Sequence, residues 1–86
     1  MGRKKAIRLK KGYRKLRLGM HKQELLSLLG EPDMITTRGK VKIFTWVNRE
    51  FKGILRGGHI ERKVFVEMEQ GAVVGYNGVY VDASTW

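Results

Sequence analysis

The stretch Leu16–Asp33 constrains the fold more than any other part of this chain, because it specifies one short helix together with both of its ends. Leu25, Leu28 and Leu29 recur at the i, i+3, i+4 spacing of one helical face, and Leu26 widens that apolar stripe. An amphipathic helix of this length is stable only when another element covers its apolar side. The stretch therefore predicts a short helix that packs on a sheet.

Signals for the start and the end of a helix flank this stripe. His21 lies where an N-cap residue belongs, and Glu24 follows three residues later, at the capping-box position. Gly30 supplies a left-handed stop, and Pro32 prevents the helix from continuing. We therefore expect the helix to lie between His21 and Gly30.

The segments after Pro32 change to the two-residue period of β-strands. Gly39 and Gln70-Gly71 are turn signals, and the glycines of residues 50–58 indicate a loop. Asn77-Gly78 is a further turn signal, expected to end the last main strand. The expected strands cover residues 34–37, 41–49, 59–70 and 72–76, with a short edge segment at 79–81. The first two are either a hairpin closed at Gly39 or one long bent strand.

These elements predict an α+β fold, in which one or two short N-terminal helices pack on a three- to four-stranded antiparallel sheet. In residues 41–48, an aliphatic row that includes Ile43 alternates with a row that contains Phe44 and Trp46. We expect the aliphatic row to face the helices. The core residues expected on this basis are Met20, Leu25, Leu28, Leu29, Ile43, Val64, Val66, Met68, Val74 and Trp46.

Phe44, Trp46 and Phe65 lie opposite the aliphatic rows of their strands. If the two faces coincide in the sheet, these aromatic side chains form an exposed patch suited to binding a protein. The alternative is that a helix or the C-terminal tail covers them.

The positive charge of the chain is concentrated at its start. The chain carries 18 Lys and Arg against 8 Asp and Glu, for a net charge of +10, and residues 1–17 contain nine of the basic groups and no acid. We expect residues 1–9 to be a flexible arm, because like charges this dense repel one another, and residues 10–86 to be a single domain whose first residues form a short helix. The basic residues of residues 1–17 are Arg3, Lys4, Lys5, Arg8, Lys10, Lys11, Arg14, Lys15 and Arg17.

These nine residues are the predicted polyanion-binding site. Lysines and arginines that neutralise phosphates release counterions and bind with little sequence preference. The alternatives are an acidic protein surface, an anionic membrane surface or no partner, in which case the segment is a solvated tail. A second candidate is an anion-binding loop with Lys52 and Arg56, whose alternative is a plain connection between strands.

No arrangement of catalytic residues is recognisable in the sequence. Ser27 has no partner base indicated by spacing, and His21 and His59 lack the spacing of a metal pair. The chain contains no cysteine, which excludes a disulfide framework and a thiolate metal site. We therefore expect no enzymatic activity, no metal and no cofactor.

The helix region resembles a known family. Gly19-Met20, Glu24-Leu25, Leu29-Gly30 and Pro32 match the signature G-M-T-x-x-(Q/E)-V-x-x-x-L-G-x-P of the SmpA/OmlA (BamE-like) domains, with His21 in place of the usual Thr. The resemblance covers about residues 10–80. It implies a fold of two helices and three strands, also seen in the β-lactamase inhibitor proteins, and a function in docking to other proteins.

The best-known members of that family are lipoproteins of the bacterial outer membrane. This sequence has neither an apolar signal segment nor an acylation cysteine, so we expect a cytoplasmic location, or a periplasmic or outer-membrane one if the sequence is part of a longer chain. The predicted function is a small non-enzymatic module that docks to a protein in a bacterial assembly while its basic arm contacts a polyanion. The alternative is a nucleic-acid-binding accessory protein acting through residues 3–17. An exposed edge strand leaves both a monomer and a dimer open.

Overall fold

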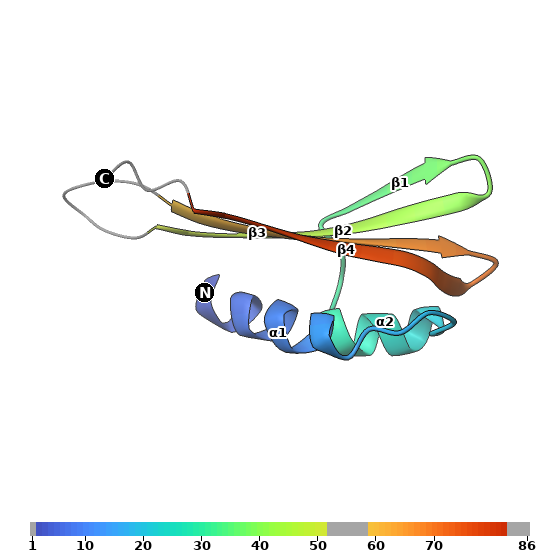
Figure 1. Ribbon diagram of the computed structural model, residues 1–86, viewed down its shortest axis with the longest axis horizontal. Coiled ribbons are helices and arrows are strands. Elements are labelled where there is room, and N and C mark those ends of the chain that lie inside the picture. Colours follow the sequence, from blue (N-terminus) through green and yellow to red (C-terminus); the bar gives the residue numbers. More distant parts are fainter. Residues whose placement is uncertain (1, 52–58, 83–86) are drawn as a thin grey trace.

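The computed structural model describes residues 2–51 and 59–82, and within them the side chains of residues 7–49 and 61–79. Over these residues, two short helices pack on one face of a four-stranded antiparallel sheet, which is an α+β arrangement (Figure 1). The strand order is β1-β2-β3-β4, so each strand pairs with its neighbours in the sequence. The elements are α1 (Gly2–Arg14), α2 (Lys22–Leu29), β1 (Met34–Arg38), β2 (Val41–Phe51), β3 (His59–Glu69) and β4 (Ala72–Asp82).

Helix α2 is the helix expected from the leucine stripe. Its N-cap is His21, whose backbone is extended and whose carbonyl accepts a hydrogen bond from the Leu25 N–H at 3.0 Å. No hydrogen bond from the His21 side chain caps the helix. At the other end the Gly30 N–H donates to the Leu26 carbonyl at 2.8 Å. Gly30 has φ 81° and ψ −165°, an extended positive-φ conformation open essentially to glycine alone, rather than the expected left-handed helical one.

The expected orientation of β2 is wrong. Strand β2 pairs Phe44 with Val66 and Trp46 with Val64, so both aromatic residues share the helix-covered face with the valines. Phe44 is 2% exposed and Trp46 is fully buried. The larger rings fill more of the space between sheet and helices than the aliphatic row could, and burying them removes more apolar area from water.

The polar atom of the buried Trp46 indole has a hydrogen-bond partner. Its Nε1–H donates a hydrogen bond of 3.1 Å to the carbonyl of Gly30, at the end of α2. A buried tryptophan usually needs such a partner. The bond therefore ties the middle of β2 to the end of the helix that covers it.

Most of the other core predictions are confirmed. Met20, Leu25, Leu29, Val64, Val66 and Met68 are buried, and Leu28 is partly buried against them. Ile43 is instead on the sheet face away from the helices. Val73 takes the place expected for Val74, because a bulge near Glu67 and Met68 inserts one extra residue into β4.

The turn expected at Asn77-Gly78 does not occur. Strand β4 continues through both residues, which pair with Phe65 and Val64 of β3. At Gly78 the strand lies close to the Tyr13 ring of α1: a Cβ placed there would lie 3.1 Å from Cε1 of Tyr13. The glycine therefore makes room for the helix.

The expected flexible arm is also wrong. Helix α1 begins at Gly2; Leu9 on its inner side is 1% exposed, and Leu16, which follows the helix, is 4% exposed. Both belong to the same hydrophobic cluster as Trp46 and Leu25. The burial of Leu9 and Leu16 opposes the repulsion between the neighbouring cations, so the basic segment forms part of the folded domain.

Candidate polyanion interface

The outer side of α1 carries most of the candidate interface. With Leu9 and Leu16 turned to the core, the basic side chains described within residues 7–17 all lie exposed. We call this set the basic face of α1; its members are Arg8, Lys10, Lys11 and Arg14 of the helix, and Lys15 and Arg17 of the segment that follows it. The side chains of Arg3, Lys4 and Lys5 lie outside the described ones, although their backbone belongs to α1.

Lysine and arginine are good helix formers, which favours α1 despite its charge. Lys11 and Arg14 lie in its last turn, where cations are stabilised by the negative end of the helix dipole. The helix ends in two tight i→i−3 hydrogen bonds, from Lys15 N–H to Gly12 C=O at 3.0 Å and from Leu16 N–H to Tyr13 C=O at 3.2 Å. The local sequence thus supports the helix and its end.

Contacts with α2 and β4 hold α1 in a defined orientation. A Cβ added to Gly12 would lie 2.5 Å from Leu29 Cδ2, so the two helices touch at this glycine. Tyr13 packs edge-on against Tyr76 of β4, with ring centroids 5.8 Å apart. These contacts fix which side of α1 faces solvent, and therefore where its cations lie.

The basic face continues into a groove between α1 and α2. The groove has a volume of about 480 Å³. Arg14, Lys15 and Arg17 line one side, and Glu24 and Ser27 of α2 line the other. Glu24 is the acidic member of the lining, so the groove retains an excess of positive charge.

A second group of lysines lies at the other end of the molecule. Lys22 of α2, Lys40 of the β1–β2 turn and Lys42 of β2 line a pocket of about 250 Å³ whose floor includes Phe44. Lys22 Nζ lies 5.8 Å from the centre of the Phe44 ring, within the range of a cation–π contact. We call these three residues the lysine pocket.

The other candidate sites from the sequence have mixed outcomes. The patch of Phe44, Trp46 and Phe65 does not exist, because the first two are buried under the helices while Phe65 pairs with Thr45 on the opposite sheet face. Lys52 and Arg56 lie outside the described residues.

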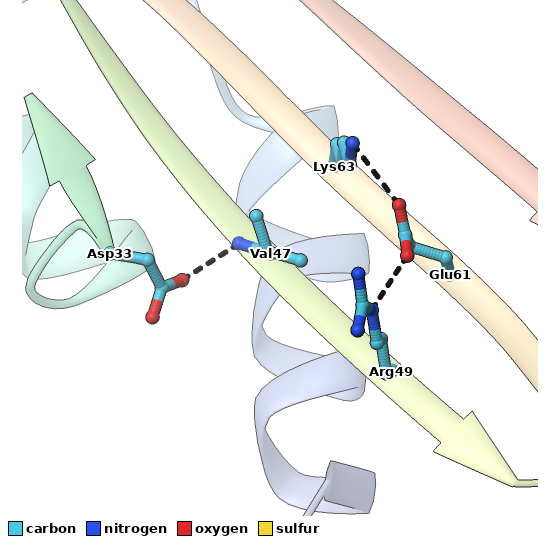
Figure 2. A network of polar contacts seen from close by, with 5 residues as sticks. All are labelled: Asp33, Val47, Arg49, Glu61 and Lys63. Carbon is cyan, nitrogen blue, oxygen red and sulfur yellow. Dashed lines mark hydrogen bonds and ion pairs between the residues drawn. The ribbon is translucent and has the colours of Figure 1, made fainter. Parts of the chain in front are cut away.

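The opposite face of the sheet contains paired charges (Figure 2). Glu61 accepts a hydrogen bond from Arg49 Nε at 2.7 Å and lies 3.2 Å from Lys63 Nζ. The hydrogen bond from Arg49, and then that from Lys63, hold the pKa of Glu61 below its ordinary value of 4.5. Among the described side chains of α1, by contrast, no ion pair is present. The cations of α1 thus remain available to an external anion.

Figure 2 also shows how β1 begins. The Val47 N–H donates to Asp33 Oδ2 at 2.7 Å, and the Asp33 N–H donates to the Thr45 carbonyl at 2.8 Å. Asp33 therefore continues the pairing of β2 at the point where β1 starts, which is a structural role.

The described residues contain no group of three or more His, Cys, Asp or Glu side chains placed to bind a metal ion. Over the same part of the chain, neither helix is long and apolar enough to span a bilayer.

The sequence predicted a short helix from about residue 10, but not that this helix begins at Gly2 and packs through Leu9. Leu9 and Leu16 are seven residues apart, with Gly12 and Tyr13 between them, which is the spacing of one helical face. This spacing in the sequence could have predicted the packed helix.

Comparisons with protein-family models, curated proteins and solved structures found no match for this chain.

Proposed function

We propose that this protein is a non-enzymatic nucleic-acid-binding protein, and that the basic face of α1 contacts the phosphate backbone of a duplex. One observation carries the proposal: α1, packed into the core through Leu9, and the short segment after it, anchored by Leu16, together present six exposed cations to solvent, within a 17-residue stretch that contains no acid. Cations positioned by a folded helix lose less conformational freedom on binding than the same charges on a disordered tail.

The dimensions of α1 suit a duplex. Its 13 residues span roughly 20 Å, and its width with side chains is about 10–12 Å, comparable with the major groove of about 12 Å. A duplex presents about twelve phosphates over that length. The helix can therefore lie along a groove or across its phosphates with several cations in contact at once.

Two other polyanion partners are less well supported by the same residues. An amphipathic helix that binds a membrane inserts its apolar side, but Leu9 and Leu16 are already buried in the protein core, which leaves Ile7 as the exposed apolar residue of the described part of α1. Single strands are usually bound by stacking bases on exposed aromatic rings. Tyr13 packs against Tyr76 instead.

Docking to a protein in a bacterial assembly, the function implied by the family resemblance, stays a prediction. Phe44 and Trp46 cannot provide its binding surface, because both are buried. A protein-docking function would need a different surface of the domain.

Fluorescence anisotropy with a labelled duplex, titrated across salt concentrations, tests the proposal. One triple variant replaces Lys11, Arg14 and Lys15 with Gln. The matched control replaces the three residues of the lysine pocket with Gln, so both variants carry a net charge of +7, which is +10 minus 3. All six positions are exposed, so neither variant should affect folding.

We expect the α1 variant to lose at least tenfold in affinity and its log–log salt slope to become shallower by about 2–3, while the control changes little. Equal losses in the two variants would show that net charge alone drives binding, and would overturn the proposal. Tighter α1-dependent binding to anionic vesicles than to the duplex at the same salt would identify a membrane as the partner, and would overturn it as well.

A further inference from the structure

The sheet face away from the helices, which we call the open face, bears a central group of apolar side chains. Figure 2 looks onto this face, with α1 behind the strands. The pairing places Met34 beside Thr45 and Thr45 beside Phe65, in one row across β1, β2 and β3. The other apolar residues of this face, assigned from the same pairing, are Val41, Ile43, Val47, Ala72 and Val79.

These side chains are only partly covered within the monomer. Met34 is 58% exposed and Val79 is 38% exposed, while Ile43, Val47 and Phe65 are half-buried by their neighbours. Single apolar side chains are common on a solvent-exposed sheet face, but a contiguous cluster of them marks an interaction surface. Some apolar or mixed surface is therefore expected to pack against it.

The charge of the open face differs sharply from that of the rest of the protein. Its described charged side chains comprise three cations and three anions, so the face is neutral although the chain carries +10. The end near the hairpin turns carries a net −1 and the opposite end a net +1. The charged residues are Arg38, Glu67 and Glu69 at the first end and Arg49, Glu61 and Lys63 at the second.

We propose that the open face binds a second copy of this chain, forming a two-fold symmetric dimer in which the two sheets pack face to face with their strands antiparallel. A two-fold axis that crosses the strands at the row of Phe65 places each strand over its own copy in the reverse direction. Phe65 then faces its symmetry mate. Glu67 and Lys63, which lie two residues to either side of Phe65, face each other across the interface.

Three observations favour a second copy over an unrelated partner. The net charges of its two ends are complementary, because reversing the face brings the end of net −1 over the end of net +1; Glu69 then faces Glu61, whose charge is offset by Arg49 and Lys63. It is neutral, so two chains of charge +10 can meet there without the repulsion that contact between their α1 helices would cause. Given the strand spacing and rise, the face covers about 500 Å² per copy, so the two together approach the roughly 1,000 Å² that a specific interface needs.

Both α1 helices stay on the outer sides of this dimer, so dimerisation does not compete with binding of a polyanion. The inference is thus independent of the proposed function, and either can fail alone.

Sedimentation velocity of the full chain, freed of nucleic acid and measured over a wide range of concentrations, tests the proposal against the monomer mass of 9.9 kDa. Met34→Lys and Ile35→Lys form a matched pair. The two residues are neighbours on β1 with similar exposure, 58% and 54%, but only Met34 lies on the open face. We expect a concentration-dependent dimer that Met34→Lys weakens at least tenfold and Ile35→Lys leaves intact.

A monomer at all concentrations would overturn the proposal. Equal weakening by both variants would also overturn it, because it would indicate pairing through the free edge of β1 rather than through the face. The antiparallel arrangement has its own test: Glu67→Lys should weaken the dimer, and adding Lys63→Glu should restore it. Failure of the double variant to restore dimerisation would overturn that arrangement.

Discussion

Replacing Gly12 with alanine tests how α1 is held against α2. At an interior helical position, alanine is favoured over glycine by about 1 kcal/mol, so helix propensity alone predicts a more stable protein. The structure predicts the reverse. The new Cβ would lie 2.5 Å from Leu29 Cδ2 and 3.0 Å from the Leu28 carbonyl oxygen, and real Cβ contacts of 2.5 Å essentially never occur.

The expected magnitude follows from what would have to move. Leu29 is 3% exposed, so its methyl group has little free space to enter, and the Leu28 oxygen is part of the α2 backbone. Moving α1 away as a whole would loosen the packing of Leu9 and Leu16. Overpacking of this kind typically costs about 1–3 kcal/mol. After subtraction of the propensity gain of about 1 kcal/mol, we expect Gly12→Ala to lower the free energy of unfolding by up to about 2 kcal/mol.

Urea unfolding followed by far-ultraviolet circular dichroism measures this change, with Lys11→Ala as the control on the exposed side of the same helix. The control should stay within about 0.5 kcal/mol of the parent. Leu29→Ala removes the atom that the new methyl group would meet, so the cost of Gly12→Ala should largely disappear in that background. If Gly12→Ala stabilises the protein, or if it costs as much in the Leu29→Ala background as in the parent, the steric argument is wrong.

Two further predictions concern the sheet. Trp46→Phe removes the Nε1–H that bonds the Gly30 carbonyl, and should lower the free energy of unfolding by about 1–3 kcal/mol in urea experiments followed by circular dichroism; an unchanged stability would contradict the role of this bond. Glu61 has a pKa lowered by Arg49 and Lys63, so its contribution is fully present above pH 4.5 and is lost as pH falls through the lower folded-state value. Glu61→Gln should therefore flatten the decline in stability below pH 4.5, measured as urea midpoints across pH, and a decline as steep as in the parent would contradict the assignment.

The structure changes how the basic segment should be tested. Deleting residues 1–17 would be the natural experiment for a flexible arm, but it would remove Leu9 and Leu16 from the core. Loss of nucleic-acid binding after such a deletion could then result from unfolding alone. Substitutions at exposed positions such as Lys11 avoid this problem, because they change the charge while leaving the packed side of α1 intact.

The sequence identified the residues of the candidate site but not the helix that arranges them. The nine basic residues are a fact of the sequence, and the sequence excludes a neighbouring acid before Glu24. Whether they lie on a disordered arm or on a packed helix depends on Leu9. Two leucines seven residues apart are too weak a signal to predict a packed helix among so many cations, unless the surface that buries them is known. The exposed aromatic patch failed for a related reason, since two alternating rows of β2 were both apolar enough to face the helices.

Local sequence was sufficient for the features that are specified within a few residues. These are helix α2 between His21 and Gly30, the turns at Gly39 and Gln70-Gly71, and the inward side of β3. Capping, positive φ and alternation act over such short distances. Three features became known only from the assembled fold: which row of β2 is buried, why β4 runs through Gly78, and that residues 2–9 are part of helix α1. Each of these depends on a contact between residues distant in the sequence, such as Trp46 with Gly30 or Tyr13 with Gly78, and on the apolar area that only the assembled layers can bury.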